Sequence, residues 1–431
     1  MSDLVRPSDR RSIATPVAIV IAGACFTSLV SCQYTATQAP PAPASTSSHP
    51  PAEPSSLFSP APAGNLDMVS LAAIQRLTAE VGFVSGWTAT GFGLAKTGDG
   101  GATWQHVAIP ASRINALRFV DADVGWAGGI VQREVPQVAC HQAAPSGARP
   151  CYGVVLRTED GGQTWNTVLS VVTDGVQGDA VRQLEAIDGQ RAWVLTLAPP
   201  PCRPANSPAL GFACPTELRR TTDGGKTWTV LLRAGIAAIR FASASRGWLA
   251  TVDSTGTVSV RVTSDGGTTW TEGLRTAGGE VLALDAASSQ TAWLMMRDGA
   301  YCTASTCTKY DRFRTSDGGL SWSSLGNPKD SATGCSIGHL VGPLFASPTL
   351  GWLALNLGAG GVQGTGGLLT TGDGGRTWRC ASRPPNTYLV TAADPLHAWV
   401  TSVQRGSGAT TLYSSDDAGG TWHPLDLRAL R

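Results

Sequence analysis

The sequence predicts an all-β protein, a seven-bladed β-propeller whose blades are four-stranded antiparallel sheets. Three observations lead to this prediction. An octamer such as TTDGGKTW recurs seven times, all 14 tryptophans fall into two sets, and short apolar stretches alternate with Gly, Asp and Ser turns. Units of about 50 residues, each with four short strands, are typical of propeller blades repeated around an axis.

Residues 236–270 show the order of elements within one unit. An apolar strand (IAAIRFA) is followed by a turn (SASR), a strand with a tryptophan (GWLATV), a third strand (TVSVRVT), the octamer and a fourth strand. Alternation with a period of two residues is typical of half-buried strands. Stacked helical hairpins are excluded, because no long stretch has a period of 3.6 residues.

The octamer is predicted to close the hairpin between the third and fourth strands. Asp-Gly is a strong hairpin signal, because glycine accepts a positive φ and Asp bonds nearby amides. The octamers carry Asp99, Asp160, Asp223, Asp265, Asp317, Asp373 and Asp417, and they end at Trp104, Trp165, Trp228, Trp270, Trp322, Trp378 and Trp422. The other tryptophans precede them one for one in GW or AW contexts, namely Trp87, Trp126, Trp193, Trp248, Trp293, Trp352 and Trp399. Two tryptophans per unit indicate packing.

The N-terminus has the order of an export signal. Arginines precede an apolar run at 13–30, and the stretch LVSC then ends at Cys32. This stretch resembles the lipobox of bacterial lipoproteins, which implies that the signal peptide and lipobox span 1–32, that the chain is cut just before Cys32, and that Cys32 becomes the lipidated N-terminus. The alternative is an uncleaved membrane helix. Both interpretations place the rest of the chain outside the cytoplasm, on the outer face of the cell membrane.

Residues 33–65 are rich in Pro, Ala, Ser and Thr, a composition that does not bury enough apolar surface to fold. We expect this segment to be a tether that joins the anchor to a propeller at 66–427. The net charge of +1 and the absence of blocks of like charge argue against nucleic acid as a partner. We expect a monomer.

Eight cysteines lie in the predicted propeller, and disulfides are the default interpretation in an exported protein. Three near pairs are Cys140 with Cys151, Cys202 with Cys214, and Cys302 with Cys307. Cys335 and Cys380 remain, but they lie near the innermost and outermost strands of blade six. Three strand spacings of about 4.8 Å separate those strands, whereas a disulfide needs Cα atoms within about 7 Å, so this pairing stays open. We predict no metal and no cofactor.

Antiparallel strands place the first-to-second and third-to-fourth turns of every blade on one face, and the other connections on the opposite face. The long insertions are second-to-third loops on that opposite face, at 132–152, 197–216, 297–310 and 357–367. The first three contain one cysteine pair each. Binding residues concentrate on loops held by a rigid scaffold, although such loops also occur without any partner.

A glycosidase needs two facing carboxylates. Several carboxylates are expected near the loop-bearing face, namely Glu134, Glu217, Asp253, Asp298 and Asp311, but nothing in the sequence pairs them. The six histidines are dispersed and have no metal or triad spacing.

The octamers match the Asp-box, also called the bacterial neuraminidase repeat, Ser/Thr-x-Asp-x-Gly-x-Thr-Trp. In sialidases and sortilin-like receptors this box is a structural turn away from the ligand face. A sialidase would also have an early Phe/Tyr-Arg-Ile-Pro, whereas SRIN at 112–115 is a poor match. The layout of apolar strand, GW and DGG-T-W turn most resembles the photosystem II assembly/stability factor family, an exported binding scaffold without known catalytic residues.

The sequence therefore predicts a membrane-anchored, extracytoplasmic binding scaffold that presents a disulfide-stiffened loop face to a protein or glycan of the cell envelope. The alternative is a sialidase-like or other glycoside hydrolase with a carboxylate pair on that face.

Overall fold

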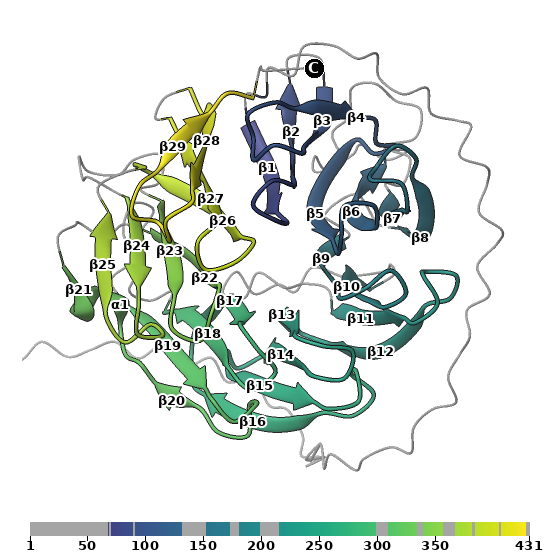
Figure 1. Cartoon of the computed structure of the whole chain (residues 1–431). Helices are drawn as coiled ribbons and strands as arrows, with labels where there is room; N and C mark the ends of the chain where they lie inside the picture. Colours follow the sequence, from purple (N-terminus) through teal and green to yellow (C-terminus); the bar gives the residue numbers. More distant parts are fainter. Residues whose placement is uncertain are drawn as a thin grey trace, which may run out of the picture. The chain divides into compact units, whose positions relative to one another are not determined.

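The computed structural model describes residues 68, 70–88, 91–131, 152–172, 181–198, 215–298, 309–333, 339–356, 367–381, 384–404 and 407–427. All of them belong to one compact unit at 44–431. Within that unit seven antiparallel sheets surround a common axis, so the predicted seven-bladed β-propeller is confirmed (Figure 1). The segment at 1–65, with the predicted signal, Cys32 and the tether, lies outside the described residues.

Each blade is built from consecutive strands. Blade one comprises β1 (Ser70–Arg76), β2 (Gly82–Thr88), β3 (Gly91–Thr97) and β4 (Gln105–Val107). Blade two comprises β5 (Arg113–Phe119), β6 (Gly125–Val131), β7 (Tyr152–Thr158) and β8 (Asn166–Val172). Blade three comprises β9 (Val181–Ala186), β10 (Ala192–Leu197), β11 (Thr216–Thr221) and β12 (Thr229–Ala234). Blade four comprises β13 (Ile236–Phe241), β14 (Gly247–Val252), β15 (Val258–Thr263) and β16 (Thr271–Thr276).

The remaining blades follow the same order. Blade five comprises β17 (Glu280–Ala286), β18 (Ala292–Arg297), β19 (Tyr310–Thr315) and β20 (Ser323–Ser324). Blade six comprises β22 (His339–Phe345), β23 (Gly351–Asn356), β24 (Leu368–Thr371) and β25 (Trp378–Ala381). Blade seven comprises β26 (Thr387–Ala392), β27 (Ala398–Val403), β28 (Thr410–Ser415) and β29 (His423–Leu425). The first strands of successive blades contact one another and are therefore innermost.

Blade six departs from the predicted four strands. A short helix, α1 (Pro328–Ser331), is capped by Asn327 and leads into β21 (Ala332–Thr333). The strand β21 pairs in parallel with the outermost strand β25, which makes a five-stranded sheet. The chain thus passes along the outer edge of blade six before it reaches the innermost strand β22.

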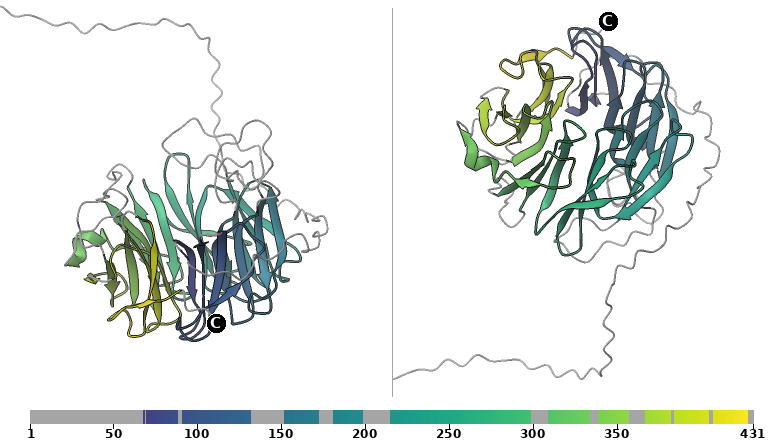
Figure 2. Two further views of the ribbon diagram at one scale, coloured as in Figure 1. Left: turned by 90° about the horizontal axis from the view of Figure 1, so that it is seen from above. Right: turned by 60° about the horizontal axis from the view of Figure 1, so that its bottom comes forward.

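The octamers and the first-to-second turns lie at the same end of the strands. In blade three the amide of Gly224 donates to the Gln190 carbonyl at 3.0 Å, and the corresponding amide makes the same bond in every other blade. We call this end the octamer face and the opposite end the loop face. The strands run between these two faces (Figure 2).

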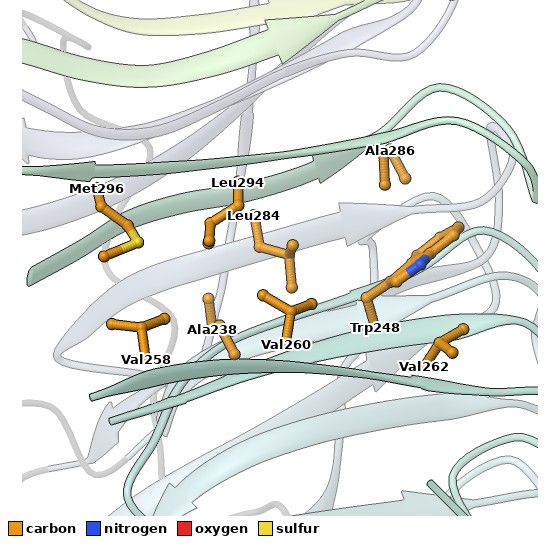
Figure 3. Packing of buried hydrophobic residues seen from close by; sticks show 11 residues of the cluster. Ala238, Trp248, Val258, Val260, Val262, Leu284, Ala286, Leu294 and Met296 are labelled. Atoms are coloured by element: carbon orange, nitrogen blue, oxygen red, sulfur yellow. The ribbon is translucent and has the colours of Figure 1, made fainter. Parts of the chain in front are cut away.

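The core consists of seven clusters of buried apolar side chains, one between each pair of neighbouring blades. Figure 3 shows the cluster between blades four and five, where Trp248 and Val260 face Leu284 and Leu294. Because no single blade buries both of its faces alone, the stability of each blade depends on its two neighbours.

Four of the GW and AW tryptophans also donate a hydrogen bond to the next blade, namely Trp126, Trp193, Trp248 and Trp293. The Trp193 indole N–H donates to the Gly266 carbonyl of the next blade at 2.9 Å, and the Trp193 ring stacks on Phe241 at 3.8 Å between centroids. In blade four the glycine before Trp248 leaves room for the Phe241 ring, because a Cβ at Gly247 would meet that ring at 2.4 Å.

Among the described strands, none is exchanged between the two ends of the ring. Blade one contains β1 to β4, and blade seven contains β26 to β29. Their interface is held by a cluster that includes Met68, Leu71, Trp104 and Trp399, with the two tryptophan rings 5.6 Å apart.

Candidate functional site

The octamer carboxylates are hydrogen-bonded within their own turns. In blade three the Thr221 hydroxyl donates to Oδ1 of Asp223 at 2.8 Å and accepts from the amide of Gly225 at 2.9 Å. Thr227 donates to Oδ1 through its amide at 2.9 Å and to Oδ2 through its hydroxyl at 2.6 Å. The other six turns repeat these four bonds with Thr or Ser at the same places.

These bonds stabilise the ionised form of the octamer aspartates. Donation from the Thr421 amide, the Thr421 hydroxyl and the Ser415 hydroxyl lowers the pKa of Asp417 to about 2. For Asp160 partial burial acts in the opposite direction, but the bonds from Thr164 and Thr158 outweigh it and also lower the pKa to about 2. A carboxylate with so low a pKa is a poor general acid at neutral pH, so we place no chemistry on the octamer face.

A second set of charges joins the innermost strands of blades two to five. Arg118 lies 3.0 Å from Glu185, Glu185 lies 3.3 Å from Arg240, and Arg240 lies 3.2 Å from Asp285. Asp285 also accepts from the Phe345 amide of blade six at 2.6 Å. Burial raises the pKa of Asp285, and Arg240 opposes that rise. Because each charge has an opposite partner on the neighbouring blade, this ladder is a connection between blades.

Sequence reasoning missed this ladder, although its signal is present. The four residues occupy the penultimate position of β5, β9, β13 and β17, opposite a GW or AW tryptophan in each blade. Gln75 holds the same position in β1 and bonds the Phe119 amide and carbonyl of blade two at 2.7 and 2.8 Å.

Three of the five carboxylates expected near the loop face have partners of their own. Glu217 is fully buried in β11 and forms ion pairs with Arg219 and, at 2.6 Å, with Arg233. Asp253 accepts from Thr255 and Thr257 in a tight turn. Asp298 lies 3.2 Å from Lys309. The structure also includes Asp311 in β19, and Glu134 lies outside the described residues.

The histidines and tyrosines are not brought together as a site among the described side chains. Burial lowers the pKa of His106, and Nδ1 of His397 lies 2.7 Å from Asp394 in the first-to-second turn of blade seven. The Tyr310 hydroxyl accepts from the Leu340 amide at 3.0 Å. No group of three His, Cys, Asp or Glu side chains in the described part of the chain is arranged to hold a metal ion.

Trp87 is the main correction to the sequence analysis. In blade one the core position of the GW tryptophan is taken by Phe83, which is buried, lies opposite Gln75 and stacks on Phe119 at 3.4 Å. Trp87 lies four residues further on, opposite Ser70 at the loop face, and 44% of it is exposed. It is therefore not one of the packing tryptophans.

Two aromatic side chains are thus exposed at the loop face of neighbouring blades. Trp87 makes an edge contact with Phe92, with ring centroids 5.4 Å apart. Tyr388 lies near the start of β26 in blade seven and is 43% exposed. The positions equivalent to Trp87 in blades two and three are Ile130 and Leu197, which are buried.

The four long second-to-third loops fall largely outside the described residues, and so do Cys140, Cys151, Cys202, Cys214, Cys302, Cys307 and Cys335. Cys380 in β25 is disulfide-bonded. Among the residues that the structure covers, no helix has the length and apolar character to cross a membrane.

Fold and faces together define the chain as a seven-bladed β-propeller with one uniform face and one variable face. No protein-family model matches the sequence, and no curated protein matches it. Solved structures are similar to it. One is described as YCF48 bound to D1 peptide, with a TM-score of 0.50, 18% identity, and coverage of 85% of this chain and 99% of that chain.

Two enzymes are also among the similar structures. The acylaminoacyl peptidase of Pyrococcus horikoshii has a TM-score of 0.54 and 11% identity over 83% of this chain and 52% of that chain. The GH74 enzyme of Niastella koreensis has a TM-score of 0.42 and 13% identity over 82% of this chain and 65% of that chain. At 18% and 11% identity, the YCF48 and acylaminoacyl peptidase structures show only that the fold is similar. The TM-score of 0.42 for the GH74 enzyme is too low to support an inference.

Proposed function

We propose that this protein is an exported, lipid-anchored scaffold without catalytic activity that binds a protein partner through its loop face. The observation that carries the proposal is the exposure of Trp87 and Tyr388 at that face. Large aromatic side chains dominate the energetics of protein interfaces. Trp87 belongs to a blade whose core position is already filled by Phe83, so packing within its own blade does not account for it.

The distribution of charge supports binding over hydrolysis. A glycoside hydrolase holds two carboxylates about 5 to 9.5 Å apart across its substrate. Glu217, Asp253 and Asp298 are instead occupied by arginine, threonine or lysine partners. The octamer aspartates accept hydrogen bonds from the Thr and Ser residues of their own turns. Of the five carboxylates expected near the loop face, a sialidase-like activity would therefore have to use Asp311 or Glu134, and Glu134 lies outside the described part of the chain.

A propeller of similar fold has been solved with a bound peptide, and this supports a protein ligand for the present chain. A glycan of the cell envelope is the second partner class that the sequence analysis favours. Aromatic side chains stack on sugar rings as well as on peptides, so the experiment has to distinguish the two.

The proposal is tested by photo-crosslinking in the cell that exports the protein. A benzophenone amino acid is placed at position 87 or 388, and as a control at Leu320, which is 67% exposed on the octamer face. We expect one protein to crosslink at 87 and 388 but not at 320, and capture of it to fail after shortening of the loop at 132–152.

Equal crosslinking at all three positions would contradict a loop-face site. Crosslinked material that contains carbohydrate but no peptide from a second protein would indicate that the partner is a glycan. Release of reducing sugar from envelope polysaccharide by the purified chain would favour the hydrolase.

A further inference from the structure

The exposed Trp87 lies at the point where the N-terminal segment joins the propeller. Ser70, the first residue of β1, is the Cα partner of Trp87 across the β1–β2 ladder. Met68 is already buried in the cluster between blades one and seven. The described chain therefore begins at the loop-face end of blade one, the end where Ser70 lies opposite Trp87.

Trp87 contacts an aromatic side chain, and the described residues next to it along β2, β3 and the connection to blade two are uncharged as far as Arg113. Trp87 packs edge-on against Phe92, and Phe92 packs against the same core cluster as Ile109 and Ala111. The described residues at 86–88, 91–92 and 107–112 include no Asp, Glu, Lys or Arg. We call Trp87 and Phe92, whose rings are in contact, the Trp87 patch.

The chain itself contains a segment with chemistry that fits this patch. Residues 50–62 read PPAEPSSLFSPAP, with five prolines. Proline-rich stretches favour the polyproline II helix, and aromatic grooves recognise that helix because it is preformed and costs little entropy to bind. With three residues per turn, Pro51 and Pro54 fall on one side of such a helix.

The connection is short enough for the segment to reach the patch. Fifteen residues at 55–69 separate Pro54 from Ser70, and a coil of that length has an end-to-end distance of roughly 20 Å. Short connections of this kind produce effective concentrations on the order of millimolar. Even an intrinsically weak contact between proline rings and an indole would then be populated.

We propose that residues 50–62 of this chain dock as a polyproline II helix on the Trp87 patch. The docked segment covers the aromatic surface of blade one and competes with any external partner for it. This inference concerns the same surface as the proposed function, but it holds whether or not an external partner exists, and its test uses no partner.

The test is hydroxyl-radical footprinting of the full chain in detergent, with mass spectrometry of tryptic peptides. Trp87 is the single tryptophan of the peptide at 77–96, and the buried Trp104 is the single tryptophan of the peptide at 97–113. The test variant replaces Pro50, Pro51, Pro54, Pro60 and Pro62 with Ala. A control variant replaces Pro40, Pro41 and Pro43, which are further from the propeller.

We expect oxidation of Trp87 to rise at least about twofold in the test variant, with no change in the control variant or at Trp104. Unchanged oxidation of Trp87 would overturn the proposal. A parallel rise at Trp104 would also overturn it, because that result would report loosening of the propeller. Protection of Trp87 that disappears on dilution would assign the segment to a second copy and contradict docking within one chain.

A second measurement uses the docked segment as a separate ligand. A synthetic peptide of residues 50–62 is added to the full-chain proline variant, and we expect it to restore protection of Trp87 at millimolar concentration. The same peptide with its five prolines replaced by alanine is the control. Equal protection by both peptides would contradict recognition of a polyproline II helix.

Discussion

The Arg76 guanidinium of blade one lies 2.6 Å from the Asp416 carboxylate of blade seven, and this contact joins the two ends of the ring. Arg76 also donates to the Ala398 and Ser415 carbonyls and the Ser414 hydroxyl at 2.9 to 3.3 Å. Because the described strands of the two terminal blades are not exchanged, side chains perform the closure that backbone pairing would otherwise provide.

Replacement of Arg76 by Ala should strongly destabilise the propeller. The side chain is only 3% exposed, and its loss would remove a buried donor from the Ala398 and Ser415 carbonyls of blade seven. We expect the free energy of unfolding to fall by about 3 kcal/mol, because Arg76 donates several buried hydrogen bonds and bonds from a charged group contribute about 1.5–3 kcal/mol. Asp416→Asn is the control, because its side chain is 62% exposed and surface pairs contribute at most about 1 kcal/mol. Equal losses in urea denaturation would contradict this account.

The octamer of blade seven contains a strained residue that the other six avoid. Ala418 has φ 64°, whereas the equivalent Gly224 of blade three has φ 73°. A left-handed conformation costs an L-residue roughly 1–2 kcal/mol, and the extra freedom of glycine in the unfolded chain offsets about 0.4–1 kcal/mol of that. Ala418→Gly should therefore stabilise the protein by about 0.5–1 kcal/mol.

The reverse substitution in blade three is the matched control. A Cβ at Gly224 would have its nearest neighbour at 3.4 Å, so Gly224→Ala tests the backbone rather than a clash. We expect the melting temperature to rise for Ala418→Gly and to fall for Gly224→Ala. A fall in both variants would show that the Ala418 side chain contributes packing that outweighs its strain.

Local turn chemistry explains why the fold could be predicted. The hydrogen bonds of Asp223 and its neighbours recur at the equivalent residues of every blade. The repeat is therefore visible in the sequence without knowledge of tertiary contacts. The hairpins and the order of strands follow from that repeat. The fifth strand β21 could not be predicted, because two residues carry too little pattern to reveal which edge they join.

Trp87 shows where the periodicity misleads. The spacing of tryptophans placed it in the core set, but Gly82-Phe83 is the true equivalent of the GW pairs, and phenylalanine can fill the same space. The ladder from Arg118 to Asp285 was missed for another reason. Its charges meet only when the innermost strands of different blades are brought into register.

Acid should destabilise the propeller over a defined range of pH. Hydrogen bonds hold the pKa of Asp160, Asp265, Asp373 and Asp417 at about 2 in the folded protein, below the ordinary value of 3.8. A lowered pKa contributes stability that is fully present above the unfolded value and is lost as pH falls through the folded value.

We therefore expect the melting temperature to be nearly constant above pH 5 and to fall steeply from about pH 4 to pH 2. Asp285 has the opposite effect on the pH dependence of stability, because its folded pKa is raised. It is a single carboxylate, whereas the pKa of four octamer aspartates is lowered to about 2. Calorimetry between pH 2.5 and 7 tests this expectation. A constant melting temperature down to pH 2.5 would show that the octamer bonds do not contribute to stability.

The lipid anchor remains a prediction from sequence. Cys32→Ser should abolish incorporation of labelled fatty acid and release the protein from the membrane fraction, because a thioether cannot form at serine. Cys25→Ser is the control, since Cys25 lies within the apolar run rather than at its end. Persistent labelling of the Cys32 variant would rule out the lipobox, and membrane retention without any label would favour an uncleaved helix.

The disulfide of Cys380 should have Cys335 as its partner. The separation of the innermost and outermost strands argued against this pairing, but β21 lies beside β25, with Thr333 opposite Arg379. The chain that leads to Cys335 therefore starts at the outer edge of blade six, next to the strand that carries Cys380. We expect non-reducing tryptic digestion to link the peptides at 330–376 and 380–405, alongside Cys140–Cys151, Cys202–Cys214 and Cys302–Cys307.

Substitution of each cysteine, alone and together, tests whether Cys335 and Cys380 form one crosslink or stabilise the protein separately. Cys335→Ser and Cys380→Ser should each destabilise the protein by about 2–4 kcal/mol, and the double variant should be no worse than either single one, because all three remove the same crosslink. Additive losses would contradict the pairing. A free thiol at Cys335 in the native protein would exclude it, since the bonded sulfur of Cys380 would then have its partner elsewhere in the chain.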